Sequence, residues 1–259
     1  MTLEQPRVPV SALTSVAGLR IVVTGGRAGI GQAIASGLGE LGARVVTVDL
    51  TEPGDAGSPE HTGSALVADV SDERAVEDTF DAAVADLGGL DVVFANAGIA
   101  GHVAPLADWS LEQWRQVQSV NLDGAFLTAR AALRRFSPGR GRKLVFTASV
   151  WGLRGSASAP CAGYSASKAG VIGLTRQLAA DTAEAGTCVN AIAPSGFLTN
   201  IAGGMMHDAD AAAPMLARQP RHTFVGPEAA VGTAAYLASA ASDHVTGHVL
   251  ALEGGYLAV

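Results

Sequence analysis

Tyr164 and Lys168 lie four residues apart in the segment Tyr-Ser-Ala-Ser-Lys, and this pair is the most informative feature of the chain. Residues at positions i and i+4 share one face of a helix, so the phenol and the ammonium would point into the same space. An unperturbed tyrosine has a pKa of about 10 and is a poor base at neutral pH. A positive charge roughly 4 Å away would lower that pKa by about three units at an effective dielectric constant near 20. The pair therefore predicts a tyrosine that acts as a general acid or base.

The same spacing is common on the surface of amphipathic helices, so the pair needs support from the rest of the chain. Residues 24–31, Thr-Gly-Gly-Arg-Ala-Gly-Ile-Gly, form a glycine-rich turn between a predicted strand and a predicted helix. Glycine permits a tight turn and a close approach of the backbone to a pyrophosphate, and the helix N-terminus attracts that anion. This context predicts a dinucleotide site. The alternative is a structural turn that needs small residues.

Asp49 ends the second predicted strand, about 20 residues after the glycines. A carboxylate at that place accepts hydrogen bonds from ribose hydroxyls and repels a 2′-phosphate. Leu50 and Thr51 follow it without an arginine, and Arg27 is the one nearby cation, which could reach a phosphate. We therefore predict NAD rather than NADP. The alternative for Asp49 is an ordinary turn carboxylate.

Short apolar runs alternate with helical patterns along the whole chain. Strands are predicted at residues 20–24, 44–49, 65–68, 91–95, 143–147, 187–192 and 249–252, and helices at 32–41, 71–87, 111–136, 162–184 and 227–238. This alternation predicts an α/β protein with a three-layer, doubly wound Rossmann fold and a seven-stranded parallel sheet. The helix at 111–136 is expected to be broken near residues 121–124.

No linker interrupts the alternation. We predict an N-terminal tail at residues 1–17 and a single catalytic domain at 18–259. A substrate lid is expected at about 197–222, where Gly203 and Gly204 would permit hinging.

Composition excludes several classes of function. The net charge is −7 without a basic block, so nucleic acid is not an expected partner. Cys161, Cys188 and six scattered histidines give no metal-ligand spacing, so no metal site is expected. We see no signal peptide and no apolar run of membrane-spanning length, and therefore expect a cytoplasmic protein that does not contact membranes.

Further motifs follow in order along the chain. They are Asp69-Val70, Asn96-Ala97-Gly98, Asn121, Ser149 and the segment from Pro194 to Thr199. With the glycine-rich turn and the Tyr164–Lys168 pair, the chain from Leu19 to Gly255 resembles the short-chain dehydrogenase/reductase family.

The resemblance implies roles for individual residues. The implied catalytic residues are Asn121, Ser149, Tyr164 and Lys168. The implied cofactor-binding residues are Gly25, Arg27, Gly29, Ile30, Gly31, Asp49, Asp69, Val70, Asn96, Ala97, Gly98, Tyr164, Lys168, Pro194, Gly196, Phe197 and Thr199. The implied substrate-binding residues are Ser149, Trp151, Tyr164, Phe197 and Met205. Ser195 stands where the family usually has glycine, and we expect Gly196 to take up the strain of that turn.

The resemblance also implies the reaction, a hydride transfer between NAD and a secondary alcohol or ketone. The ending Gly254-Gly255-Tyr256 resembles dehydrogenases of polyols, sugars and sugar acids, and we favour such a substrate. Trp151, Phe197 and the methionines would instead suit apolar cyclic or aromatic ketones and alcohols. A non-catalytic NAD-sensing protein is a third alternative. By the same resemblance a homotetramer is expected, or a dimer.

Overall fold

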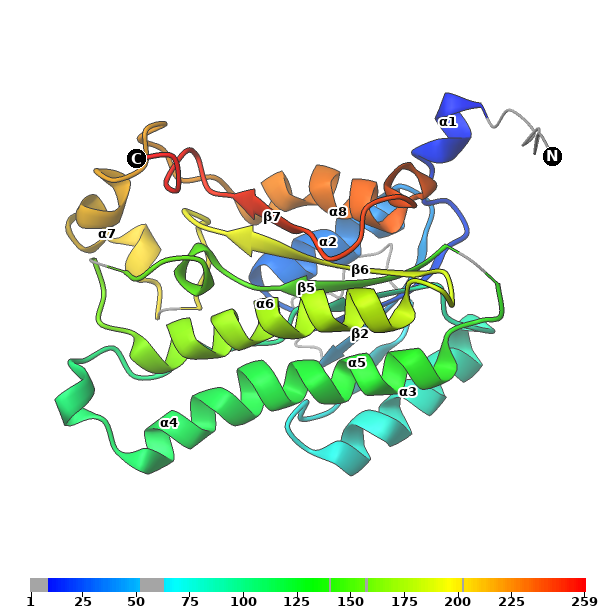
Figure 1. Ribbon diagram of the computed structural model, residues 1–259, viewed down its shortest axis with the longest axis horizontal. Helices are drawn as coiled ribbons and strands as arrows, with labels where there is room; N and C mark the ends of the chain where they lie inside the picture. Colours follow the sequence, from blue (N-terminus) through cyan, green and yellow to red (C-terminus); the bar gives the residue numbers. More distant parts are fainter. Residues whose placement is uncertain (1–8, 52–62, 140, 157, 202) are drawn as a thin grey trace.

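In the computed structural model, seven parallel strands form one sheet in the order β3-β2-β1-β4-β5-β6-β7 (Figure 1). The structure describes residues 9–51, 63–139, 141–156, 158–201 and 203–259. The strands are β1 (Arg20–Thr24), β2 (Arg44–Asp49), β3 (Ala65–Val67), β4 (Val92–Ala95), β5 (Arg142–Thr147), β6 (Thr187–Pro194) and β7 (Val249–Leu252). The predicted doubly wound fold is confirmed.

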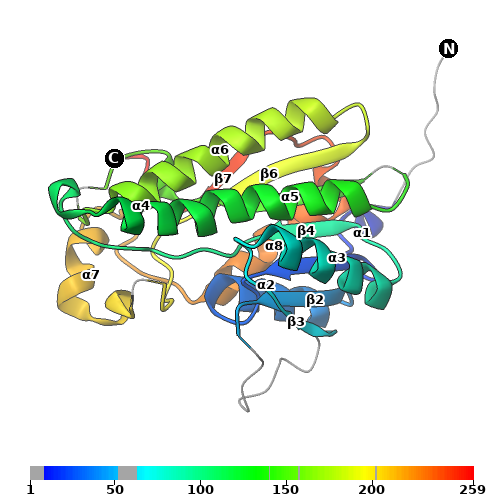
Figure 2. The same ribbon diagram turned by 90° about the horizontal axis from the view of Figure 1, so that it is seen from below.

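Helices cover both faces of the sheet (Figure 2). One face carries α2 (Gly29–Glu40) and α8 (Val231–Ala238), and the other carries α3 (Glu73–Leu87), α4 (Leu111–Gln118), α5 (Gly124–Arg135) and α6 (Ala162–Thr182). Side chains alternate along each strand, so Ile21 and Val23 pack in the core under α2 and α8, while Val22 packs in the opposite core. Because every central strand is buried on both faces, the strands are continuous apolar runs.

The order of the strands fixes where a ligand can bind. The chain leaves β1 toward β2 and β3 on one side, and returns through β4 to β7 on the other. The loops after β1 and β4 therefore diverge, which opens a crevice at the carboxyl ends of the strands. All the predicted motifs follow strand ends at this edge or lie on the helices beside it.

The long helix predicted at 111–136 is interrupted where expected. α4 continues into a π-helical turn, Ser119–Asp123, before α5 begins at Gly124. Asn121 lies in this turn and is buried. Its side chain bonds to a neighbouring loop, which explains a local widening of the helix at this residue.

The start of α3 differs from the sequence-based expectation, which began this helix at Ser71. Asp72, rather than Ser71, caps α3 by accepting hydrogen bonds from the N–H groups of Arg74 and Ala75. Asp69 instead accepts from the N–H and hydroxyl of Ser71. Both carboxylates compete for nearby donors, and sequence spacing alone does not distinguish them.

The described part of the predicted N-terminal tail belongs to the fold. It contains a helical turn, α1 (Val10–Leu13), and Val16 is buried in the core. Among the described residues, none of the helices combines the length and apolar character that crossing a bilayer requires.

The predicted lid segment, 197–222, contains more regular structure than its sequence suggested. It includes a 3-10 turn, Met205–His207, and a short helix, α7 (Ala209–Leu216). Asp208 caps α7 by accepting from the N–H groups of Asp210 and Ala211. Phe197 forms a parallel bridge with Val225, so the two ends of the segment lie together.

Candidate active site

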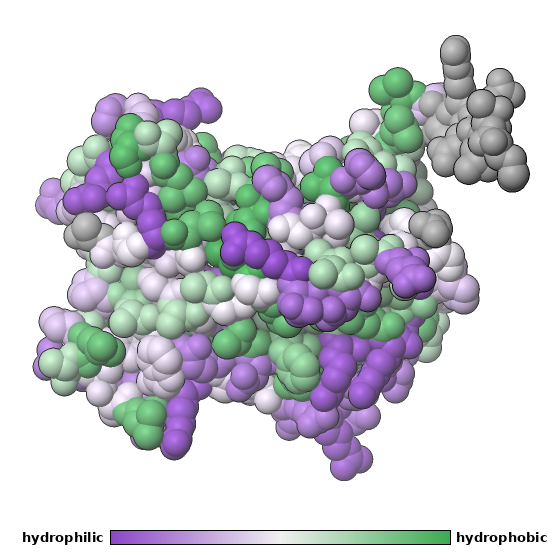
Figure 3. All heavy atoms as spheres, viewed as in Figure 1, coloured by the Kyte–Doolittle hydropathy of each residue, from purple (hydrophilic) through white to green (hydrophobic). Residues whose placement is uncertain are grey.

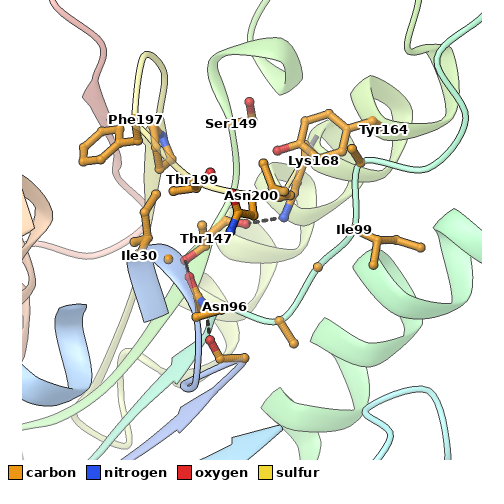
Figure 4. A pocket seen from close by; sticks show the side chains of 18 of the residues that line it. Ile30, Asn96, Ile99, Thr147, Ser149, Tyr164, Lys168, Phe197, Thr199 and Asn200 are labelled. Atoms are coloured by element: carbon orange, nitrogen blue, oxygen red, sulfur yellow. Dashed lines mark hydrogen bonds between the residues drawn. The ribbon is translucent and has the colours of Figure 1, made fainter. Parts of the chain in front are cut away.

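A cavity of about 920 Å³ occupies the crevice at the carboxyl ends of the strands (Figure 4). This volume is near the upper end of the range for ligand pockets, roughly 300–1,000 Å³. Predicted site residues that line it are Gly25, Gly29, Ile30, Asp49, Asp69, Val70, Asn96, Ala97, Gly98, Ser149, Trp151, Tyr164, Lys168, Pro194, Gly196, Phe197 and Thr199. The fold thus gathers residues from seven separate segments around one space.

Tyr164 and Lys168 lie one turn apart on α6, as their spacing predicts. The Lys168 ammonium nitrogen is 5.6 Å from the centre of the Tyr164 ring. It donates a hydrogen bond of 2.7 Å to the carbonyl oxygen of Thr147, at the end of β5. Lys168 is only 2 % exposed, so this bond holds a buried cation in a fixed direction.

Burial dominates the protonation of this pair. Desolvation raises the pKa of Tyr164 to about 12, although hydrogen bonding with Ser149 acts in the opposite direction. Desolvation also lowers the pKa of Lys168 to about 8. The lowering expected for the loaded site needs the positive charges of both Lys168 and an oxidised nicotinamide ring. Desolvation of the phenolate, which spacing does not reveal, acts against that lowering.

Ser149 follows β5 and is buried in the cavity wall. Its hydroxyl oxygen accepts a hydrogen bond of 3.2 Å from the Trp151 N–H. The Trp151 ring meets the Tyr164 ring edge-to-face, with ring centres 6.0 Å apart. The serine hydroxyl and the aromatic wall therefore come from one short loop.

Asn121 supports the site from behind the cavity lining. Its side-chain oxygen accepts from the Ile99 N–H at 2.8 Å, and its amide nitrogen donates to the Ile99 carbonyl at 2.9 Å. The same nitrogen donates to the Ser167 hydroxyl, which donates to the Tyr164 carbonyl at 2.7 Å. Asn121 thus links the loop after β4 to the turn of α6 that carries the tyrosine.

The glycine-rich turn has the backbone shape that a dinucleotide pyrophosphate needs. Gly25 and Gly29 adopt φ values of +64° and +52°, which side chains disfavour. α2 begins at Gly29, so its free N–H groups face the cavity. A β-carbon at Gly31 would collide with the Gly25 carbonyl and the Asn96 amide. These features fit a nicotinamide dinucleotide.

Asn96 and Thr147 connect this turn to the lysine. The Asn96 amide donates to the Gly25 carbonyl at 3.1 Å, and the Thr147 hydroxyl donates to the Asn96 side-chain oxygen at 3.0 Å. Thr147 also supplies the carbonyl that holds Lys168 (Figure 4). Sequence analysis missed Thr147 and Ser167, since a lone hydroxyl residue in a strand or helix carries no distinctive signal.

Asp49 ends β2 and faces the cavity with a fixed carboxylate. Its two oxygens accept hydrogen bonds from the N–H groups of Arg27 and Leu50. The Arg27 guanidinium donates to the Leu66 carbonyl at 3.2 Å, and Arg27 is not among the residues that line the cavity. The expectation that this arginine reaches a phosphate therefore does not agree with the geometry, because its side chain is directed toward β3.

The turn after β6 differs from the expectation at one aromatic residue. Gly196 has φ +69°, and Ser195 avoids the left-handed region, so Gly196 takes up the strain as predicted. Phe197 touches the cavity, but its side chain is 7 % exposed and packs in the core under α2 and α8. It therefore contributes mainly backbone to the cavity rather than an aromatic wall.

The lining of the cavity also includes the apolar residues Val103, Trp151, Ile201, Met206 and Met215 and the polar residues Asn200 and His207. Of these, Trp151 contacts the Tyr164 ring. The side chain of Met205, which we expected to touch substrate, lies outside the described part of the structure. Within the described ranges, no group of histidine, cysteine or acidic residues has the geometry of a metal site.

The amino-acid sequence matches a protein-family model and several characterised dehydrogenases over most of its length. A family model described as Enoyl-(Acyl carrier protein) reductase matches residues 25–257. The cis-4-hydroxycyclohexanecarboxylate dehydrogenase of Sinomonas cyclohexanicum is 41 % identical over 246 residues, which cover 92 % of this chain and 96 % of that protein. The 2-dehydro-3-deoxy-D-gluconate 5-dehydrogenase of Escherichia coli (strain K12) is 34 % identical, with 94 % of this chain and 97 % of that protein covered.

A solved structure has the same architecture. A short chain dehydrogenase from Burkholderia cenocepacia J2315, in complex with NADP, superposes with a TM-score of 0.85 at 28 % identity. The match covers 94 % of this chain and 99 % of that one.

Proposed function

This chain belongs to the short-chain dehydrogenase/reductase family of oxidoreductases, and on that premise we propose that it is an NAD-dependent dehydrogenase of alicyclic secondary alcohols. The observation that carries the proposal is the juxtaposition of Ser149, Tyr164 and Lys168 with an apolar cavity wall and a glycine-rich dinucleotide turn.

Each catalytic side chain has a separate task in the proposed reaction. A nicotinamide coenzyme held at the glycine-rich turn would supply the hydride acceptor for oxidation of the carbinol carbon to a ketone, and the hydride donor for the reverse reaction. In reduction Tyr164 donates its phenolic proton to the substrate oxygen. In oxidation the phenolate form would take the hydroxyl proton, and the positive charges of Lys168 and of the oxidised nicotinamide ring would stabilise that phenolate against the cost of burial. Ser149 orients the substrate oxygen and stabilises its partial charge. Lys168 supplies positive charge near the phenol, and Asn121 keeps the tyrosine-bearing turn in place.

The preference for NAD rests on Asp49. Its carboxylate, oriented by two backbone N–H groups, would accept hydrogen bonds from ribose hydroxyls and repel a 2′-phosphate. A similar protein holds NADP, so coenzyme choice needs a direct test. We expect NADH to bind at least about tenfold more tightly than NADPH, measured by quenching of protein fluorescence, and Asp49→Ser to reduce the ratio. Tighter binding of NADPH would refute the preference.

The substrate class rests on the cavity wall beside the tyrosine. Trp151, Met206, Met215 and Ile201 offer apolar surface that suits a carbocyclic ring better than a chain of hydroxyl groups. The relative from Sinomonas cyclohexanicum is named for a cyclic alcohol. Of the two classes considered from the sequence, the wall favours the apolar cyclic one.

Sugar acids and polyols, which we first favoured, form the second candidate. Asn200 and His207 add polar groups to the wall, and the Escherichia coli relative is named for a sugar-acid derivative. Formation of NADH at 340 nm, measured with cyclohexanols, sugar acids and linear polyols, separates the two classes. Firm NADH binding without turnover of any alcohol in this panel would instead favour a non-catalytic NAD sensor.

A homotetramer is part of the proposal. Leu111, Phe126 and Tyr236 are exposed on α4, α5 and α8, where apolar side chains gain from burial between copies. Light scattering after gel filtration is expected to give a mass near four times the 26.1 kDa of one chain. A dimer is the second expectation, and a monomer would contradict both.

A further inference from the structure

The residues that line the cavity differ in burial, and we take the buried ones as its deep end and the exposed ones as its mouth. Ser149 and Lys168 are buried at the deep end. Trp151 and Met215 form an apolar middle, and Met215 is itself buried. Ile201 and His207, from the segment after β6, line the same cavity with exposed side chains. A ligand that fits this gradient has a hydroxyl at one end, an apolar body, and a polar group that keeps contact with water at the other end.

The charge at the mouth is positive or neutral. Among the described residues that line the cavity, the basic side chains are Lys168 and His207. Lys168 is committed to the Thr147 carbonyl and the tyrosine. His207 is the remaining one, and its imidazole can donate an N–H in either protonation state.

Among the described residues that line the cavity, the acidic side chains lie far from His207. The carboxylate of the adjacent Asp208 is already used to cap α7. The acidic lining residues, Asp49 and Asp69, follow β2 and β3. His207 follows β6, and four strand steps separate β2 from β6, a distance of about 20 Å. An anion at the mouth is therefore remote from both carboxylates.

We propose that the substrate is a hydroxy acid and that His207 is a specificity-determining residue that binds its carboxylate. The inference rests on the proposed alcohol dehydrogenase function and deepens it. The alcohol end lies against Ser149 and Tyr164, the ring or carbon chain packs against the apolar middle, and the carboxylate meets His207 where it stays partly hydrated. The exposed position matters, because a fully buried carboxylate would lose its hydration.

The test compares an acid with its uncharged ester. We would measure kcat and KM with NAD for cis-4-hydroxycyclohexanecarboxylate and for its methyl ester. A hydrogen bond to a charged group changes binding by roughly tenfold to hundredfold. The acid is therefore expected to have a KM lower than the ester by at least about tenfold.

Three variants assign that preference to one side chain. His207→Phe keeps a planar ring without a donor, and is expected to raise the KM of the acid at least about tenfold while leaving kcat and the ester nearly unchanged. His207→Gln keeps an N–H donor and is expected to retain much of the preference. His244→Phe changes another exposed histidine that does not line the cavity, and is expected to behave as the unmodified enzyme.

The proposal would be overturned if the ratio of the ester KM to the acid KM in His207→Phe equalled that of the unmodified enzyme. It would also be overturned if the variant raised both KM values by the same factor. An unmodified enzyme that does not prefer the acid would overturn it too, even though its alcohol dehydrogenase function would then stand. A second experiment tests the role of His207 without catalysis. It titrates cyclohexanecarboxylate into the enzyme–NADH complex and monitors binding by NADH fluorescence. Equal affinity in the unmodified enzyme and in His207→Phe refutes the inference. Lack of turnover with every alcohol refutes the proposed function instead.

Discussion

At the scale of single residues, burial shifts the pKa values of Tyr164 and Lys168 away from their ordinary values, in opposite directions. The tyrosine holds its proton more tightly, with a pKa raised to about 12, and the lysine holds its own less tightly, with a pKa lowered to about 8. At neutral pH Lys168 still carries its charge, so the phenol faces a cation.

Tyr164→Phe removes only the hydroxyl and preserves the ring that packs against Trp151. We expect turnover to fall by about two to four orders of magnitude, because proton transfer by a side chain contributes roughly that much. The affinity for NADH is expected to stay within about threefold, since the ring keeps its place. Steady-state kinetics and a fluorescence titration measure the two quantities. Retention of substantial turnover would contradict the proton-transfer assignment.

Lys168→Met is expected to abolish turnover and to stabilise the fold. The lowered pKa of Lys168 corresponds to a cost of about 3 kcal/mol for burying its charge. Loss of the bond to Thr147 offsets part of this gain, so we expect a rise in Tm of a few degrees at pH 7, measured by scanning fluorimetry without coenzyme.

The pH dependence of this gain has a definite sign. Below about pH 8 Lys168 is protonated in both the folded and unfolded states, and the burial cost is fully present. Between pH 8 and the model-compound pKa of 10.5 the folded state loses its proton first, so unmodified protein gains stability as pH rises. The advantage of the variant should therefore vanish near pH 10.

Lys143 provides the matched control for this prediction. It is also a buried lysine, but its ammonium pairs with Asp243 at 2.6 Å. Lys143→Met should not raise Tm, because the ion pair with Asp243 already compensates the buried charge of Lys143. A lower Tm in Lys168→Met at pH 7 would show that its charge is not a cost to the fold.

Single residues also show how far the sequence could predict the site. The spacing of Tyr164 and Lys168 predicted a shared face, because helical geometry is local. The burial that raises the pKa of Tyr164 was not predictable, because it depends on Trp151 and the loop after β5, which spacing does not describe. His207 was missed, since it lies in a segment without periodicity.

At the scale of elements, two of the glycines in helix α2 have different tasks. Gly31 faces the Gly25 carbonyl and the Asn96 amide, whereas Gly37 faces the Val231 side chain on the neighbouring helix. One glycine therefore serves the coenzyme turn and the other serves helix packing.

Gly31→Ala is expected to weaken NADH binding by at least about tenfold, because the added methyl group displaces the turn that receives the pyrophosphate. Isothermal titration with NADH measures the change. Gly37→Ala is the matched control in the same helix. It should lower Tm by a few degrees through crowding of Val231 while leaving NADH affinity unchanged. Equal affinity loss in both variants would point to a general distortion of α2.

Element boundaries depended on competition between neighbouring side chains. The break at Asn121 was predictable, because asparagine is unfavourable inside a helix. Its π-helical form was not, since that form follows from the bonds between Asn121 and Ile99 across the fold. The α7 helix was also missed, because Pro214 lies within it and obscures the helical pattern.

At the scale of the whole molecule, charged side chains join two helices on the outer layer. Glu77 on α3 pairs with Arg130, Arg134 and Arg135 of α5 at 3.4, 2.7 and 2.6 Å. Hydrophilic residues gather over this pair of helices in the surface view (Figure 3). Glu77 is the shared partner of three cations. Arg130 and Arg135 also pair with Glu73 and Asp81, so removal of Glu77 leaves Arg134 without its ion pair.

Glu77→Gln is expected to destabilise the fold by about 1 kcal/mol, or a few degrees in Tm, with a smaller effect in high salt. A hydrogen bond from Arg135 is the main cause of the lowered pKa of Glu77. This contribution is present at neutral pH and is lost as pH falls through the lowered pKa. Thermal unfolding at two salt concentrations tests it. Asp78→Asn, which alters an exposed pair with Arg74 at 3.6 Å, should have no measurable effect.

Because Phe197 and Val225 form a bridge, the segment between them could be replaced by another loop without moving its two ends. Leu198 donates to the Val225 carbonyl, and Val225 donates to the Gly196 carbonyl, so the scaffold itself holds both anchor points. A grafted loop twice as long would add only about 0.6 kcal/mol of closure entropy. Natural variation and laboratory recombination can therefore change substrate specificity by replacing this one segment. Ser149, Tyr164 and Lys168 lie outside it and would keep their positions.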